Sequence, residues 1–344
     1  MGHLKYIIQN KYHHTLSNLT AMPALRKPLL AIILLLCYNS SYCWGFYAHK
    51  QINYYAVFLL PPEMQVLYKP SVNFLSAHAV DPDKRRYAMA AEGARHYIDL
   101  DRYAAAAKTM PQKWDSAVAK FSADTLNAHG IVPWWIQTMM LRLTAAFREK
   151  NQSKILRLSA EIGHYIADAH VPLHTSSNHN GQLTGQTGIH GFWESRLPEL
   201  LAEKEWDFFI GKADYIQNPA SYIWKRVYES AAEADTVLRF EKKLSAQFGS
   251  DQRFSFEERN GVLVRQYAAA YARAYNNMLQ GMVERRMRQS IYSVASFWYS
   301  AWVNAGQPDL KNLSGKTFTE EEVKEFEELD IQWKQHAGNL HDHD

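Results

Sequence analysis

Cysteine is nearly absent from this sequence. Only Cys37 and Cys43 occur among 344 residues, and both lie close to the N-terminus. If the N-terminal segment is removed, as argued below, the mature chain has no thiol from which a disulfide could form. Another form of stabilisation, such as a bound metal cluster, must then help to hold an exported chain of this kind together.

A strong net charge is absent as well. The 38 Lys and Arg residues nearly balance the 35 Asp and Glu residues, which leaves a formal net charge of +3 and a pI of about 8.6. So weak a balance does not by itself indicate a nucleic-acid or membrane partner. The hydrophobic content of 47% is that of a globular protein with a substantial core.

The apolar run near the N-terminus is too short for a typical membrane span. It covers residues 28–38, PLLAIILLLCY, whereas a spanning helix needs ~20 apolar residues. Arg26 and Lys27 precede this run, and small and polar residues follow it. This order of a basic, an apolar and a polar segment is typical of a secretory signal peptide.

We therefore expect residues 1–43 to be a signal peptide, with Met1 and Met22 as alternative starts. Cleavage after Cys43 would leave Ser41 and Cys43 at the positions where small residues are preferred. Lipid modification at Cys37 is an alternative, although LLLC matches such sites poorly. Either route predicts an exported protein that acts in the periplasm or outside the cell.

The sequence also lacks a succession of alternating strands, a glycine-rich phosphate loop and an internal repeat. Residues 134–150 and 154–170 carry apolar side chains at helical spacing, and residues 260–303 form a long Ala-rich and aromatic run that predicts one or two helices. The Gly-, Ser- and Asn-rich residues 176–188 predict a loop. We expect one all-α domain over residues 44–305, followed by a charged helix and a frayed tail over residues 306–344.

Metal-capable side chains concentrate in GHYIADAHVPLHTS, residues 163–176. His164 and Asp168 are four residues apart and share one helix face. Pro172 cannot continue a helix, so His174 is expected at the helix exit. His190 and Glu194 repeat the four-residue spacing after the loop. One such pair alone is more typical of an ion pair, but two pairs of imidazole and carboxylate within about thirty residues indicate zinc.

Two upstream motifs extend this pattern. AVDPDKRRY places Asp81 and Asp83 beside a basic cluster, and ARHYIDLDRY contains His96. With these motifs the chain resembles the superfamily of trinuclear zinc phosphodiesterases, which contains single-strand-specific nucleases and bacterial zinc-dependent phospholipases C. Nine positions match the metal ligands of that family in order, over about 150 residues. They are Trp44, His49, Asp81, His96, His164, Asp168, His174, His190 and Glu194.

The resemblance implies three Zn²⁺ ions with these ligands. One ion is implied to bind Asp81, His96, His164 and Asp168. The second is implied to bind His49, the bridging Asp168, and the amine and carbonyl of Trp44, which cleavage would make the first residue. The third is implied to bind His174, His190 and Glu194. His170 has no counterpart in this set and is expected outside the metal centre.

The resemblance also implies hydrolysis of a phosphodiester by a metal-activated water, without a covalent enzyme intermediate. Lys84 or Arg85 falls where the nucleases carry an arginine for the scissile phosphate. Tyr97 matches a residue that stacks on a base, and Asp99 one that hydrogen-bonds its edge. Asp101 matches an acidic residue implicated in catalysis. Read without the resemblance, these five residues would be a solvated basic run, a core tyrosine and surface carboxylates.

The substrate class follows from the spacing within the family. The gaps from Trp44 to His49 and from Asp81 to His96 resemble those of the nucleases, which favours single-stranded DNA or RNA as substrate. Glu194 is instead typical of the phospholipases, so phospholipid is the alternative substrate. A zinc-binding structural protein without turnover is the alternative of a different class. Nothing in the sequence indicates a protein partner, and we expect a monomer.

Overall fold

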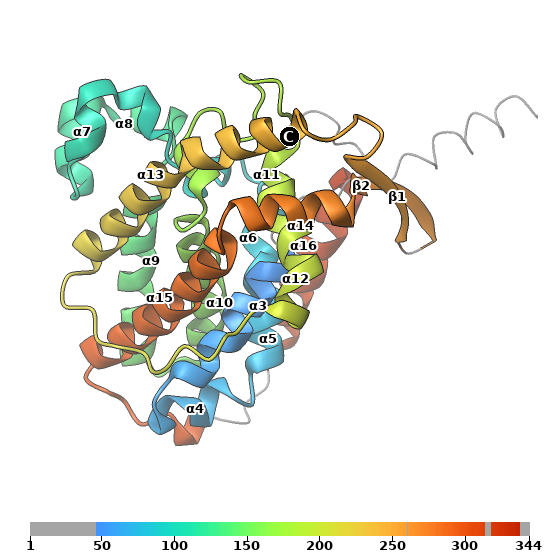
Figure 1. Ribbon diagram of the computed structural model, residues 1–344. Helices are drawn as coiled ribbons and strands as arrows, with labels where there is room; N and C mark the ends of the chain where they lie inside the picture. The colour runs from blue at the N-terminus through green and yellow to red at the C-terminus, as the bar shows by residue number, and fades with distance from the viewer. Residues whose placement is uncertain (1–45, 260, 314–317, 338–344) are drawn as a thin grey trace, which may run out of the picture.

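The computed structural model describes residues 46–259, 261–313 and 318–337, so the predicted signal peptide (residues 1–43) lies outside them. The described chain is mostly helical, which confirms the predicted all-α class (Figure 1). The α-helices before the polar loop are α3 (Phe46–Ala56), α4 (Pro62–Tyr68), α5 (Val72–Ala77), α6 (Asp81–Arg85), α7 (Trp114–Phe121), α8 (Ala123–Ala128), α9 (Val132–Arg148) and α10 (Gln152–Asp168). Those after it are α11 (Ile189–Gly191), α12 (Leu197–Glu205), α13 (Pro219–Ser245), α14 (Ala269–Met278), α15 (Met282–Asn304) and α16 (Glu320–Ala337).

Short helical turns connect several of these helices and carry residues of the predicted site. The 3₁₀ turns are η2 (Val57–Leu59), η3 (His78–Val80), η4 (Gly93–Arg95), η5 (Leu100–Thr109), η6 (Pro172–Thr175) and η8 (Lys311–Leu313). A π-helical turn, η7 (Phe192–Arg196), continues α11. Such π turns are rare and occur most often at functional sites.

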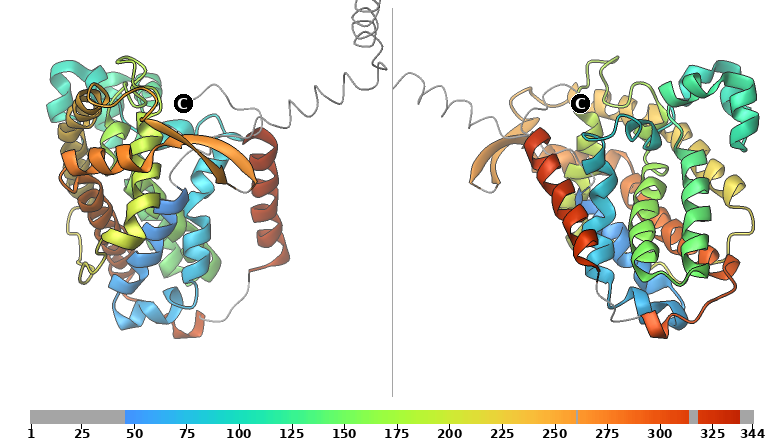
Figure 2. Two further views of the ribbon diagram at one scale, coloured as in Figure 1. Left: turned by 45° about the vertical axis from the view of Figure 1, so that its right-hand side comes forward. Right: turned by 180° about the vertical axis from the view of Figure 1, so that it is seen from behind.

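Helix α10 is the central element of the fold. It starts where the Asn151 side chain accepts a hydrogen bond from the backbone N–H of Lys154, which caps the helix. It ends at Asp168 because Pro172 has no N–H and its ring would clash with the carbonyl of residue 168 in a continued helix. Helices α9, α3 and α15 pack around α10, and their apolar faces form the main core with it (Figures 1 and 2).

A close approach between α3 and α10 brings two of the predicted ligands together. The Asn53 amide on α3 donates to the carbonyl of Ala160 on α10 over 3.0 Å. A Cβ at Gly163 would lie 2.0 Å from Asn53 Oδ1, so a larger residue at this position would displace the Asn53 side chain. The contact stacks the His49 ring on the His164 ring with 3.9 Å between their centroids.

One segment differs from the helical prediction. Residues Phe254–Arg259 and Val262–Tyr267 form an antiparallel hairpin of strands β1 and β2, in which Phe254 pairs with Tyr267. Helix α14 begins only at Ala269, so the predicted helical run over residues 260–303 is wrong in its first part. The remainder confirms the alternative of two helices, α14 and α15.

The C-terminal helix packs on the body of the protein along α5 and α6 (Figure 2). Phe326 contacts the rings of Phe74 and His78, and Trp333 contacts Phe46 in the first turn of α3. Over the described ranges, no helix combines the length and apolar character that crossing a bilayer would require.

Candidate metal centre

Asp168 lies at the centre of the predicted site, buried at the C-terminal end of α10. Its two carboxylate oxygens face different histidines. Oδ1 lies 3.3 Å from His49 Nε2 and 3.8 Å from His174 Nε2. Oδ2 lies 3.1 Å from His96 Nδ1 and 3.3 Å from His164 Nε2. Asp168 is therefore placed to link two neighbouring groups of ligands.

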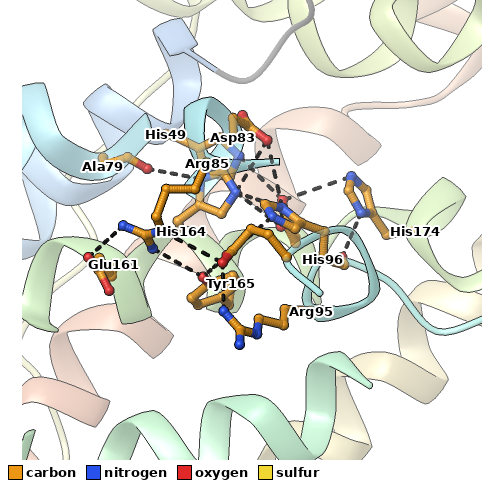
Figure 3. Close-up of polar contacts among 12 residues, drawn as sticks. His49, Ala79, Asp83, Arg85, Arg95, His96, Glu161, His164, Tyr165 and His174 are labelled. Atoms are coloured by element: carbon orange, nitrogen blue, oxygen red, sulfur yellow. Dashed lines mark hydrogen bonds and ion pairs between the residues drawn. The ribbon is translucent and has the colours of Figure 1, made fainter. Parts of the chain in front are cut away.

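The group at Oδ2 contains an acidic residue that the sequence prediction passed over. Asp83 Oδ1 lies 3.6 Å from His164 Nε2 and 3.7 Å from His96 Nδ1 (Figure 3). The two histidine nitrogens are 3.0 Å apart. Donor atoms on a tetrahedron around zinc, with bonds of about 2.0–2.1 Å, lie about 3.3 Å apart. These separations suit a single ion.

Asp81, which the sequence prediction places in this group, is directed elsewhere. Its Oδ2 lies 2.6 Å from His78 Nδ1, and its Oδ1 accepts a hydrogen bond from Lys84 over 3.0 Å. Residues three apart share a helix face, so Asp81 at the start of α6 is directed to Lys84 and Asp83 is rotated to another side of the helix. The structure thus replaces Asp81 with Asp83 beside His96 and His164.

The third predicted group assembles beside the first two. Glu194 on η7 lies with Oε2 3.2 Å from His174 Nε2 and with Oε1 2.8 Å from His190 Nε2. The side chains of His174 and His190 are 11% and 19% exposed, whereas that of Glu194 is buried at 5%. This group therefore opens to solvent on its histidine side.

Backbone carbonyls determine which ring nitrogen faces the centre in three histidines. A carbonyl oxygen only accepts, so the ring nitrogen that contacts it must carry the proton. Nδ1 of His164 donates to Ala79, Nδ1 of His174 to His96, and Nδ1 of His190 to His179. When each ring is neutral, its Nε2 therefore presents a lone pair toward the centre, which is the state that a metal requires.

The buried carboxylates give the site a negative charge that favours the binding of cations. Burial alone would favour neutral rings, but the Asp168 carboxylate outweighs it and raises the pKa of His164 and His174 to about 9. In turn, His190 and His174 overcome burial and lower the pKa of Glu194 to about 2. Protons thus compensate the buried carboxylates where metal ions could do so.

These observations test whether the residues fit zinc. Within each of three groups, the donor atoms lie within 4.8 Å of one another, and the groups together comprise five imidazoles and three carboxylates. This chemistry suits Zn²⁺. The predicted ligand Trp44 lies outside the described residues, but α3 begins at Phe46, close to it in sequence. The residues present therefore fit the metal centre that the sequence predicts, with the exchange of Asp81 for Asp83.

Both cations predicted to bind the phosphate already have carboxylate partners. Lys84 donates to Asp81 and also to Asp330 on α16, over 2.6 Å. Arg85 points toward α10, where it contacts Glu161 at 2.8 Å and the Tyr165 hydroxyl at 3.4 Å (Figure 3). These contacts stabilise the packing of α6, and they oppose the predicted role of either side chain as the phosphate ligand.

The predicted substrate contacts lie together on the segment after His96. Tyr97 and Asp99 are both half-buried. Burial and the nearby Asp101 raise the pKa of Asp99 to about 6. Asp101 itself accepts hydrogen bonds from the backbone N–H of Ser177, at 3.0 and 3.1 Å, and so anchors the loop that follows His174. This structural role accompanies the catalytic one that the sequence predicts.

Three residues near the centre were missed by the sequence reasoning. Arg86 is exposed, and its charge acts on Tyr97 and His179. Partial burial and the charges of His190, His174 and Arg86 lower the pKa of His179 to about 4. Glu92 is fully buried next to His96. The sequence signal for Arg86 was its place in the run of three cations in DKRRY, of which only Lys84 and Arg85 were considered.

His170 lies outside the three donor groups, as expected. It is a buried core residue whose Nδ1 donates to the Ile166 carbonyl over 2.7 Å and whose Nε2 contacts Ser293 at 3.0 Å.

The chain matches no protein-family model and no curated protein.

Proposed function

We propose that this chain is an exported zinc-dependent phosphodiesterase with the fold of the trinuclear zinc hydrolases, acting as a monomer on single-stranded DNA or RNA. One observation carries this proposal: five imidazoles and three carboxylates from segments far apart in the sequence meet in three adjoining groups. The order of these residues along the chain also resembles the ligand order of the family, apart from the exchange of Asp81 for Asp83.

The residues would divide the three ions among them as follows. Asp83, His96 and His164 would hold one ion and share Asp168 with a second, held by His49 and the terminal Trp44. The remaining residues, His174, His190 and Glu194, would hold the third. Zinc bound in these groups supplies Lewis-acid chemistry, which lowers the pKa of water and polarises a phosphoryl oxygen.

The surrounding side chains suit a nucleotide. Arg86 is exposed near Tyr97 and His179, and its planar guanidinium can bind a phosphate through two hydrogen bonds. Tyr97 offers an aromatic face on which a base can stack, without preference for its sequence. Asp99 is protonated in part near pH 6, so it can both donate to and accept from the edge of a base.

Phospholipid is the second candidate substrate, because Glu194 closes the third group as in the phospholipases. The alternative of a different class is a zinc protein without turnover. The third group argues against this alternative, because within the described residues it offers three protein ligands and is partly exposed. A structural zinc site normally has four protein ligands, whereas a site with an open position is typical of an enzyme.

The test is hydrolysis by the purified mature protein loaded with zinc. Single-stranded DNA, RNA and phosphatidylcholine vesicles are incubated separately, and the products are measured with and without a chelator. We expect zinc-dependent cleavage of the nucleic acids. Arg86→Ala is expected to reduce kcat/KM about tenfold or more through loss of a charged hydrogen bond, whereas Arg148→Ala, at an exposed arginine that ends α9, serves as the control.

Three outcomes would contradict this proposal in different ways. Turnover of phosphatidylcholine alone would make the protein a phospholipase C. Protein that carries three zinc ions but hydrolyses none of the substrates would be structural. Full activity after exhaustive chelation would exclude the zinc mechanism altogether.

A further inference from the structure

His96 is oriented differently from the other histidines of the centre. In His164, His174 and His190, Nδ1 contacts a backbone carbonyl and Nε2 faces the centre. In His96 the ring is reversed, and Nδ1 faces Asp168 at 3.1 Å and Asp83 at 3.7 Å. Its Nε2 is buried and makes no hydrogen bond of normal length within the described chain. The carboxylate of Glu92, with Oε1 3.7 Å away, faces this nitrogen.

Glu92 is held in place by an unusually complete set of partners. Its side chain is fully buried just before η4. Arg95 donates to Oε2 over 2.6 Å, and Arg85 Nε lies 3.6 Å from the same oxygen. The Tyr165 hydroxyl donates to Oε1. Two guanidinium groups keep the carboxylate ionised, so it can only accept hydrogen bonds.

The proposed phosphodiester chemistry does not use Glu92, and the contacts to Arg85 and Arg95 leave Oε1 directed at Tyr165 and His96. A neutral imidazole carries one proton, and whichever nitrogen holds it cannot bind a metal. In metal sites the second ring nitrogen typically donates to a carboxylate or carbonyl, which fixes the ring and raises its basicity. Backbone carbonyls accept this hydrogen bond from His164, His174 and His190. For His96, the available acceptor is the carboxylate of Glu92.

We propose that Glu92 is a positioning residue, which accepts the Nε2 proton of His96 and thereby commits Nδ1 as a zinc donor. The inference rests on the proposed function only in that this group binds zinc. No step of hydrolysis is involved, so the test measures metal binding and the protonation of one ring.

The first measurement is the affinity for zinc, obtained by competition with a chromophoric chelator. Glu92→Gln keeps the size of the side chain but removes its charge, and we expect the affinity of one of the zinc sites to fall by about 10–100-fold. Glu161→Gln is the matched control, because Glu161 also pairs with Arg85 but does not touch His96. We expect the control to bind zinc within about twofold of the wild type. Equal losses in both variants would overturn the proposal, because the effect would then come from Arg85.

The second measurement is made on the zinc-loaded wild-type protein, in which Nδ1 of His96 is expected to bind zinc, and it needs no variant. The ¹⁵N shifts of the His96 ring show which nitrogen is protonated, and we expect the proton on Nε2. A proton on Nδ1 would overturn the proposal. If Glu92→Gln fails to fold, Glu92→Asp retains the charge for Arg95 and withdraws the carboxylate from His96, and we expect the same loss of affinity.

The measurements distinguish a failure of the role proposed for Glu92 from a failure of the proposed phosphodiesterase function. Weak zinc binding by the Glu92 variants in a protein that hydrolyses no phosphodiester would support the role of Glu92 and contradict the proposed function. An active enzyme whose Glu92 variants bind zinc as tightly as the wild type would support the proposed function and contradict the role of Glu92.

Discussion

At the scale of single residues, Asp81 and Asp83 show how close two opposite roles can lie in a sequence. Both carboxylates precede the same basic run, and the family resemblance assigns the ligand to Asp81. In the structure Asp81 pairs with His78 and Lys84, while Asp83 faces His96 and His164. A difference of two positions on a one-turn helix decides which carboxylate faces His96 and His164.

This difference yields a prediction for two matched variants. Asp83→Asn is expected to lose about one zinc per chain on dialysis, because an amide is a much weaker ligand than a carboxylate. Asp81→Asn should keep its zinc and instead lose about 1–3 kcal/mol of unfolding free energy, because His78 and Lys84 lose a partly buried hydrogen-bonded partner. Bound zinc is measured by elemental analysis at fixed free zinc, and stability by urea unfolding. Loss of zinc from the Asp81 variant alone would restore the original ligand assignment.

At the scale of elements, the hairpin shows a signal that was present in the sequence but misread. Asn-Gly between two runs rich in β-branched and aromatic residues is a strong indication of a two-residue hairpin turn. The Ala-rich stretch that follows favours helix and extended the helical prediction too far toward the N-terminus. Strand β2 nevertheless contacts the candidate metal centre through η7, which carries Glu194. Arg196 on η7 donates to the Tyr267 carbonyl over 2.9 Å.

Helix α16 is the second element whose role was not evident from its composition. Its acidic sequence predicts a surface helix, yet Trp333 contacts Phe46 and Asp330 pairs with Lys84. The helix therefore supports both α6, which carries Asp83, and the first turn of α3. The sequence indicated the helix itself, whereas its docking partners depend on which side of α5 and α6 remains open.

We expect Trp333→Ala to lower the unfolding free energy by about 1–2 kcal/mol, because it removes an aromatic contact and partly buried apolar surface. Asp330→Asn should cost less than about 1 kcal/mol, as is usual for a half-exposed ion pair. Glu328→Gln on the exposed face of the same helix is the control and should change stability by less than about 0.5 kcal/mol. Urea unfolding of the zinc-loaded protein measures all three. A Trp333 variant as stable as the control would show that α16 does not stabilise the body of the protein.

At the scale of the whole molecule, the candidate metal centre lies where α3, α6, α10 and the segments after them converge. Its buried carboxylates are costly to desolvate unless cations compensate their charge. No cysteine follows Cys43 in the sequence, so cleavage at the predicted position would leave the mature chain without a disulfide for this stabilising role. The free energy of zinc binding is therefore expected to contribute directly to folding.

Removal of the metal tests this expectation on the intact protein. At a zinc concentration about 1,000 times the dissociation constant, one site contributes about 4 kcal/mol, which corresponds to roughly 10 °C in Tm for a chain of this size. Chelation should therefore lower Tm by at least that amount, and added zinc should restore it. A thiol reductant should have no effect on the mature chain. An unchanged Tm after complete removal of zinc would mean that the cluster of donors does not need a metal to fold.

The sequence by itself determined the helical class, the course of α9 and α10, and most of the candidate ligands. Helical periodicity, the cap at Asn151 and the stop at Pro172 act over a few residues, so they can be recognised without a partner segment. The four-residue spacing of His164 and Asp168, and of His190 and Glu194, likewise determines a shared face locally.

Only the tertiary structure decided which groups meet across the chain. The choice of Asp83 over Asp81, the burial of Glu92 behind His96, the diversion of Arg85 to Glu161 and the position of α16 all depend on packing between segments distant in sequence. Such contacts are selected by steric fit, burial and the pairing of charges in three dimensions. The clearest instance is Gly163. In the sequence this glycine predicts only flexibility, but in the fold its missing side chain leaves space for Asn53. The resulting close approach of α3 to α10 stacks His49 on His164.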